Sequence, residues 1–277
     1  MARECVELVA LARPIREKEN VPVAQNRRQK PAKGPNLKPF YTALVVVAAA
    51  GIGWIAYSYA TGGGRAAVAP IELTGMDDPQ ALVSAARGVT AGQGDAPVQV
   101  LIFSDFTCPA CRSFTTAIEP LLKQKYVQQG LAKFVYYDYP IGGQGAHRHG
   151  FLAARAARCA EEQGKFWEYH DVLFGRQPEW ALSRTPPTEE MIEYAGLIQG
   201  LNADGFEQCL LSDRHAELVT ANRLLGDELG VGATPTIFIG QRSFPQWSNW
   251  EAMQAAIESQ LPPGAMPADT AEAAGAP

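Results

Sequence analysis

Apolar and polar positions recur with different periods along the chain, and the changes of period divide it into elements. Residues 96–106 (APVQVLIFSDF) are a mainly apolar run that predicts a buried strand. Over residues 109–129 apolar side chains recur three and four positions apart, as in a helix, and Pro120 is expected to kink that helix. Residues 131–140 (LAKFVYYDYP) predict a second strand. Because a strand–helix–strand unit needs a right-handed crossover, the two strands are expected to pair in parallel.

The second half of the chain is mainly helical before it returns to strands. Helical periodicity extends over about residues 146–229, and a third strand follows at 234–240 (TPTIFIG). A short edge strand and an amphipathic helix over 248–261 close the pattern. Residues typical of helix N-caps mark the starts of three of these helices: Thr188, Asn202, and Ser248 or Asn249. This order of elements predicts an α/β fold with a helical insertion over about residues 145–230.

Two segments lack a regular pattern. Residues 61–91 are rich in Gly and Ala and predict a linker, with room for a short helix near 79–87. Residues 262–277 hold no aromatic side chain and predict a disordered tail. The ordered domain is therefore expected to cover residues 92–261.

An uncharged apolar stretch precedes the linker. Residues 40–60 (FYTALVVVAAAGIGWIAYSYA) are long enough to cross a bilayer, which needs about 20 apolar residues. The basic residues on its N-terminal side predict that residues 1–39 are cytoplasmic and that the rest is exported to the periplasm or another extracytoplasmic space. The alternative is a cleaved signal peptide ending in SYA at 58–60. The length of the stretch and the 39 residues before it favour a retained single-pass anchor.

Charge is distributed unevenly along the chain. Residues 1–40 hold nine of the 24 Lys and Arg residues and four of the 29 Asp and Glu residues, so the remainder is acidic. An acidic body argues against a nucleic-acid partner, which would attract a basic surface.

Four of the five cysteines follow the predicted anchor. In an oxidising compartment an even number predicts two disulfides, and adjacency favours Cys108 with Cys111, which leaves Cys159 with Cys209. The second pair would close a loop of about 50 residues and serve as a structural bridge. Two free thiols or a second redox pair are its alternatives.

The Cys-x-x-Cys pair has three possible uses. A structural zinc site needs four ligands, and the sequence offers one such pair, with only His147 and His149 nearby, so no metal is expected. A structural staple closing four residues would stabilise the chain little. A redox pair fits the position, because Cys108 directly precedes a helix that begins with Pro109. The free N–H groups and the dipole of that helix would stabilise a Cys108 thiolate.

Three segments in this order, FSDFTCPACRSF, RCAEEQGKFWEYHDVLF and VGATPTIFIG, resemble the DsbA-like thiol-disulfide oxidoreductases of the thioredoxin superfamily. The likeness is greatest to membrane-anchored bacterial members. It implies a thioredoxin fold with an inserted helical domain, in which Cys108 attacks, Cys111 resolves, and Pro235 is a cis-proline facing them. The backbone of Thr234, with Pro109 and Ala110 between the cysteines, would bind the substrate chain.

The same resemblance implies partners and chemistry. The only redox group is the Cys108–Cys111 disulfide, with no further cofactor. The implied substrates are exported proteins with cysteines. The implied partner that reoxidises the protein is a quinone-linked membrane oxidase, DsbB-like or similar to vitamin K epoxide reductase. The chain is expected to be a monomer.

Two positions depart from the family pattern. Many relatives place an acid six residues before the first cysteine, where this chain has Ile102, so Asp105 is the nearby candidate for a proton relay. Strong oxidants often place a thiolate-stabilising residue such as His at the position of Ala110. We therefore expect a dithiol oxidase of moderate potential. A reductase or isomerase of the same compartment and a non-catalytic thioredoxin-like binding module are the alternatives.

Overall fold

The structure is a computed structural model, and it describes residues 38–60, 70–142 and 145–265. The predicted cytoplasmic segment therefore lies outside the described residues up to residue 37. The same holds for residues 61–69 of the predicted linker and for the predicted tail from residue 266 onward. Helix α1 (Lys38–Ala60) covers the segment for which an anchor is predicted. Among the described residues, no helix combines the length and apolarity that a membrane crossing requires.

A five-stranded sheet forms the centre of the remaining part, in the order β1-β3-β2-β4-β5. Its strands are β1 (Val89–Ala91), β2 (Val98–Ser104), β3 (Ala132–Asp138), β4 (Thr236–Ile239) and β5 (Arg242–Phe244). As predicted from the crossover rule, β2 and β3 pair in parallel. Strand β4 pairs antiparallel to β2, and β5 forms the edge beside it. The predicted strands are thus confirmed. The central strand β2 is an apolar run, as expected for a strand that is buried on both faces.

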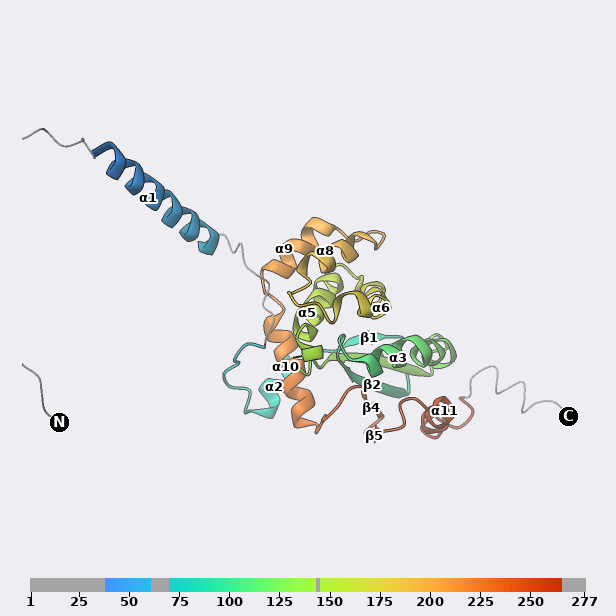
Figure 1. The fold of residues 1–277 in the computed structure, drawn as a ribbon. Helices are drawn as coiled ribbons and strands as arrows, with labels where there is room; N and C mark the ends of the chain where they lie inside the picture. Colours follow the sequence, from blue (N-terminus) through green and yellow to red (C-terminus); the bar gives the residue numbers. More distant parts are fainter. Residues whose placement is uncertain (1–37, 61–69, 143–144, 266–277) are drawn as a thin grey trace, which may run out of the picture. The chain divides into compact units, whose positions relative to one another are not determined.

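Helices cover this sheet and form the insertion. In the view of Figure 1, α5, α6, α8 and α9 are gathered near the β1 edge of the sheet, and α11 lies near β5. The helices of the domain are α2 (Pro79–Ala85), α3 (Pro109–Ala117), α4 (Glu119–Leu122), α5 (Gly150–Glu161), α6 (Phe166–Gly175), α7 (Gln177–Trp180), α8 (Thr188–Gly196), α9 (Ala203–Leu211), α10 (Ala216–Glu228) and α11 (Trp250–Glu258). The helical insertion is therefore confirmed and lies between β3 and β4.

Helix boundaries follow the local sequence with one exception. The helix after β2 breaks between α3 and α4, where Pro120 occupies the first turn of α4 and cannot donate a backbone hydrogen bond. Asn202 and Asn249 accept hydrogen bonds from Gly205 N and Ala252 N, as N-caps do. Thr188 is not a cap: it is the first helical residue of α8, and Pro187 precedes it without a side-chain hydrogen bond.

Part of the predicted linker belongs to the folded domain. Val89–Ala91 forms the edge strand β1, which pairs antiparallel with β3, and Asp78 caps α2 through Gln80 N. No pattern in the sequence predicts this strand, because three residues are too few to show alternation.

A buried ion pair joins the insertion to the sheet. Arg158 of α5 donates from Nε to Asp138 Oδ2 at 2.6 Å, and both side chains are fully buried at the end of β3. Asn222 of α10 donates to the same Oδ2, and Arg158 also bonds the carbonyl oxygen of Arg87. Charged groups tolerate burial only with such partners, so this network fixes how α5 and α10 pack on β3.

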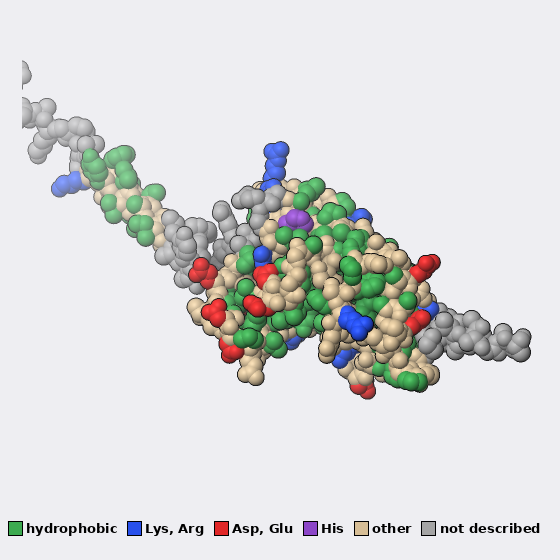
Figure 2. Space-filling model, turned by 90° about the horizontal axis from the view of Figure 1, so that it is seen from below, with side chains coloured by type: hydrophobic (Ala, Val, Ile, Leu, Met, Phe, Trp, Pro, Cys, Tyr) green, Lys and Arg blue, Asp and Glu red, His purple; other side chains and the backbone are tan. Residues whose placement is uncertain are grey.

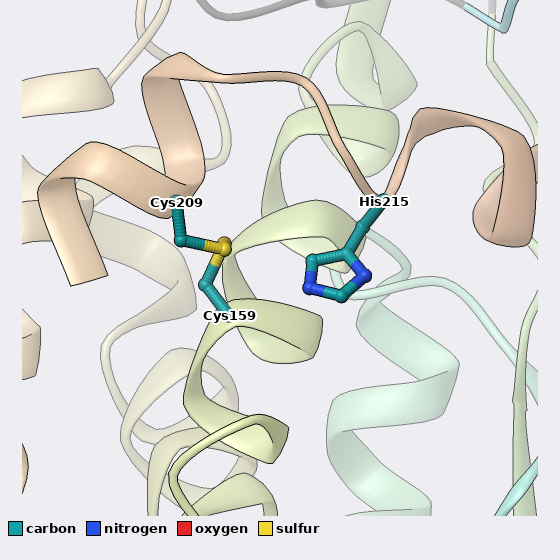
Figure 3. Close-up of side chains that lie close together, drawn as sticks. All are labelled: Cys159, Cys209 and His215. Atoms are coloured by element: carbon teal, nitrogen blue, oxygen red, sulfur yellow. A yellow bond between two sulfur atoms is a disulfide. The ribbon is translucent and has the colours of Figure 1, made fainter. Parts of the chain in front are cut away.

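A disulfide holds the insertion together. Cys159 at the end of α5 is bonded to Cys209 of α9, with a Cα–Cα distance of 5.7 Å and a sequence separation of 50. Figure 3 shows the bridge between the two helices, with His215 beside it. Both cysteines are buried. The predicted pairing of Cys159 with Cys209 is confirmed.

Candidate active site

The two remaining cysteines of the domain lie where β2 passes into α3. Cys108 is the N-cap of α3, with φ −78° and ψ 122°, and its N–H donates to Asp105 O at 3.0 Å. Pro109 at the first helical position starts the helix without losing a hydrogen bond. Cys108 is 6% exposed and Cys111 is fully buried, and both are free thiols. A reagent or substrate that approaches from solvent therefore reaches Cys108 first.

The environment favours the ionised form of Cys108. The pKa of its thiol is lowered to about 5, above all because the Cys111 thiol donates a hydrogen bond to the sulfur. Thr234 and the backbone N–H groups of Cys111 and Ala110 lower it further, against the opposing effect of burial. These N–H groups belong to the first turn of α3, where they have no partner within the helix. Cys108 is thus a thiolate near neutral pH.

Cys111 behaves in the opposite way. Burial raises the pKa of its thiol well above the ordinary value, and the neighbouring Cys108 raises it further. The side chain of Ser104, the last residue of β2, opposes this effect in part. The pair therefore consists of an accessible thiolate and a buried thiol. Thiol–disulfide exchange requires such a pair, one sulfur to form the mixed disulfide and a neighbouring one to resolve it.

The loop before β4 faces Cys108. The peptide bond between Thr234 and Pro235 is cis, as predicted. Antiparallel pairing places Thr236 opposite Phe103 at the end of β2, which brings Thr234 next to the cysteines. Cys108 Sγ lies 3.3 Å from Thr234 O. The Thr234 hydroxyl oxygen is buried and has no hydrogen-bond partner among the described residues, so it is available to donate to a Cys108 thiolate.

The structure brings together most of the residues that the sequence proposed for the site. Cys108, Cys111, Thr234 and Pro235 meet at one end of the sheet. Of the two residues between the cysteines, Pro109 is exposed and Ala110 is half-buried against the apolar core.

Asp105, the candidate for a proton relay, is buried beside the cysteines. It is 1% exposed and accepts hydrogen bonds from Thr107 N at 2.8 Å and Thr107 Oγ1 at 2.6 Å through Oδ1. Its Oδ2 accepts from Ile141 N at 2.9 Å. A Cβ at Gly150 would come within 2.5 Å of Asp105 Oδ1, so only glycine lets α5 begin this close to the carboxylate. These contacts show that Asp105 orients the loop before Cys108.

Two residues that sequence reasoning missed also hold this loop. Gln177 of the insertion donates from Nε2 to Phe106 O at 2.7 Å and to Cys108 O at 3.0 Å. Arg112 of α3 donates from Nε to Phe174 O, the last turn of α6. No local pattern marks Gln177, because it lies about 70 residues away from its partners. The insertion therefore fixes the backbone on which Cys108 is presented.

Two groups of side chains have the composition of metal ligands, and neither carries an argument for an ion. Cys159, Cys209 and His215 lie close together, but the sulfurs are joined in the disulfide, and a metal binds thiolates. The second group consists of Glu119, His170 and Asp171. Lys123 Nζ lies 2.6 Å from Glu119 Oε1, and the side chains of His170 and Asp171 are hydrogen-bonded to each other. Lysine already supplies the positive charge there.

Charged side chains of both signs are spread over the visible surface. On the face shown in Figure 2, acidic and basic side chains lie scattered among apolar and uncharged ones. The described residues of this face form no continuous basic surface of the kind that binds a phosphate backbone.

Comparisons with known proteins agree with this geometry. A thioredoxin family model matches residues 84–259. Disulfide bond formation protein D of Bacillus subtilis is 27% identical over 179 residues, which cover 61% of this chain and 75% of that protein. The crystal structure of oxidised BdbD from Bacillus subtilis superposes with a TM-score of 0.56 at 25% identity, covering 62% of this chain and 91% of that one. Na(+)/H(+) antiporter NhaA 3 of Salinispora tropica is 31% identical over 185 residues, which cover 67% of this chain but only 26% of the antiporter.

Proposed function

Since this chain belongs to the thioredoxin family and its relatives are DsbA- and BdbD-like thiol-disulfide oxidoreductases, we propose that it is a dithiol oxidase that introduces disulfides into exported proteins. The redox group is the Cys108–Cys111 pair itself, as in these relatives, which use a redox-active disulfide and no external cofactor. The observation that carries the proposal is the contrast between the two thiols, one with a pKa near 5 and the other buried with a raised pKa.

The proposed reaction is two successive thiol–disulfide exchanges. A substrate thiolate attacks Cys108 Sγ in the Cys108–Cys111 disulfide, and the Cys111 sulfur leaves and takes up a proton. A second substrate thiolate then attacks the substrate sulfur of the mixed disulfide and displaces the Cys108 thiolate. The substrate has lost two electrons and two protons, of which one proton is on Cys111 and the other in solvent. Because thiols of low pKa leave faster, the stabilised Cys108 thiolate favours the second step. It also favours the overall oxidation of the substrate, because it stabilises the reduced form of the site.

The backbone at Thr234 is the proposed docking site for the substrate chain. Thr234 lies beside Cys108, and an extended substrate can add to this segment by main-chain pairing while its cysteine meets the sulfur. Pro109 is exposed next to Cys108 and would contact the same chain. A relay role for Asp105 in the protonation of Cys111 stays a prediction, since its hydrogen bonds go to Thr107 and Ile141.

Partners and location are part of the proposal. A relative named disulfide bond formation protein D supports an oxidative role, and an oxidase needs an electron acceptor after each turnover. We assign that task to a quinone-linked membrane oxidase, DsbB-like or related to vitamin K epoxide reductase. An anchor at residues 40–60 would hold the domain, as a monomer, on the extracytoplasmic face of the cytoplasmic membrane, where its substrates emerge.

A redox titration of the purified full-length chain in glutathione buffers tests the direction of electron flow. We expect a reduction potential between that of thioredoxin, about −270 mV, and that of DsbA, about −120 mV, because the reduced form is stabilised by the Cys108 thiolate. Alkylation followed by mass analysis measures the fraction of the Cys108–Cys111 disulfide. A potential at or below that of thioredoxin would assign the chain to the reductases instead.

Replacing Thr234 with valine is expected to raise the pKa of Cys108 from about 5, because the substitution removes a hydrogen bond that stabilises the thiolate. The ionised form then appears at higher pH, so the alkylation rate of Cys108 reaches its half-maximum at a higher pH than in the unmodified protein. The rate of iodoacetamide labelling, followed between pH 3 and about pH 9, measures the midpoint.

Thr116→Val is the matched control for that substitution. Thr116 is exposed on α3, and its hydroxyl bonds Arg112 O rather than a cysteine, so its loss leaves the midpoint in place. An unchanged midpoint in Thr234→Val would show that the hydroxyl does not reach the thiolate.

A further inference from the structure

A histidine from the loop after β3 lies against the active-site loop. His147 ends a short 3-10 helix, Gly145–His147, and its side chain is 28% exposed. The ring nitrogen Nδ1 lies 3.0 Å from Thr107 Oγ1 and 3.4 Å from Asp105 Oδ2. Thr107 directly precedes Cys108, so the imidazole is next to the segment that carries the thiolate.

The hydrogen bonds around Thr107 determine which nitrogen of His147 carries a proton. Thr107 Oγ1 donates its only hydrogen to Asp105 Oδ1 at 2.6 Å. The same oxygen must therefore accept from His147, so Nδ1 is the protonated nitrogen. Asp105 Oδ2, which also lies near Nδ1, favours a proton on the same nitrogen. Ile141 N donates a hydrogen bond to this carboxylate and holds it in place. The chain thus orients one imidazole edge toward buried acceptors.

This arrangement favours a charged imidazole close to Cys108. The hydrogen bond with Asp105 raises the pKa of His147, and the charges of Asp105 and of a Cys108 thiolate raise it further, against the effect of burial. Asp105 comes from the loop after β2, and Cys108 from the start of α3. Because linkage is reciprocal, a thiolate that stabilises the imidazolium is stabilised by it to the same extent.

We propose that His147 is a positioning residue of the redox site: held by Asp105 and Thr107, it supplies a positive charge that stabilises the Cys108 thiolate and makes the disulfide more oxidising. The residue between the cysteines on the Cys111 side, Ala110, has no side-chain donor, so this charge comes from a loop about 40 residues further along the chain. The inference rests on the proposed function for its consequence, but the interaction itself concerns two side chains and is measurable without any substrate.

The test compares His147→Gln, His147→Lys and the unmodified full-length chain. In His147→Gln we expect the acid dissociation constant of Cys108 to fall roughly three- to tenfold, the effect of losing one nearby positive charge at a partly buried site. The equilibrium between the protein and glutathione should shift toward the Cys108–Cys111 disulfide, because the reduced form loses the same stabilisation. His147→Lys keeps a positive charge and should recover at least half of the difference on a logarithmic scale. Thiolate absorbance against pH and the glutathione titration are the two readouts.

Arg148→Gln is the matched control, since it removes one positive charge from the neighbouring exposed residue. It should leave both constants within about twofold of the unmodified protein. An equal effect of Arg148→Gln and His147→Gln, or no effect of His147→Gln, overturns the proposal. Neither result would depend on whether the chain acts as oxidase or reductase.

A second measurement avoids substitutions at this loop. Nuclear magnetic resonance of the imidazole protons gives the pKa of His147 in the reduced and the oxidised protein. We expect a higher pKa in the reduced protein, because only this form has the Cys108 thiolate. Equal values in both forms would contradict the proposal even if the variants failed to fold.

Discussion

Replacing Cys108 with serine is expected to abolish disulfide transfer to a reduced substrate. A serine hydroxyl forms no disulfide, so neither the disulfide with Cys111 nor the mixed disulfide with a substrate can form. The rate of oxidation of a peptide with two cysteines should fall by roughly three orders of magnitude or more, as when an essential nucleophile is removed. Fluorescence or mass analysis of the peptide follows the reaction, with the protein oxidised beforehand.

Cys111→Ser should give a different result, because it removes only the buried partner. The Cys108 thiolate then exchanges with a substrate disulfide, and the mixed disulfide accumulates because Cys111 can no longer displace the bound substrate sulfur. A mixed disulfide visible on a non-reducing gel is the expected product. Cys5→Ser, which removes a thiol outside the domain, serves as the control and should match the unmodified chain. Residual transfer by Cys108→Ser, or the absence of trapped substrate in Cys111→Ser, would show that the roles are assigned wrongly.

The sequence was most informative where a property is local. The apolar run of β2, the helix start at Pro109 and the kink at Pro120 each depend on a few adjacent residues, and all are present in the structure. The order of three family motifs predicted the cis peptide before Pro235, and counting cysteines predicted the bridge between Cys159 and Cys209.

Long-range contacts of ordinary polar residues were not predictable in this way. Gln177 and His147 reach the active-site loop from other elements, and neither lies in a pattern that distinguishes it from a surface residue. Asp105 could be placed near the cysteines, but its burial depends on Gly150, which lies at the start of α5. Such positions follow from the packing of the insertion on the sheet rather than from local preference.

The insertion therefore has a physical role in the site beyond covering the sheet. Gln177 holds two carbonyl groups of the active-site loop, and Arg112 ties α3 to the end of α6. The first turn of α3 stabilises the thiolate only if its N–H groups point at the sulfur, which requires a fixed loop. Interactions that stabilise the insertion consequently contribute to the properties of Cys108.

The Cys159–Cys209 bridge is expected to be the largest of these contributions to stability. Removing it with Cys159→Ala and Cys209→Ala together should lower the free energy of unfolding by about 4 kcal/mol, the chain-entropy value for a loop of 50 residues. Urea or guanidinium unfolding of the oxidised proteins, monitored by circular dichroism, measures the difference. In the presence of a reductant that breaks the bridge in the unmodified chain, the two proteins should differ by less than about 1 kcal/mol.

The same double variant separates a structural bridge from a second redox pair. Both sulfurs are buried between α5 and α9, so no substrate reaches them in the folded protein. Below its unfolding temperature the variant should therefore oxidise a dithiol peptide within about twofold of the unmodified rate. Loss of transfer at unchanged stability would instead mean that electrons pass through this bridge. Because a buried bridge is removed from exchange with thiolates, we expect the loss to appear in stability alone.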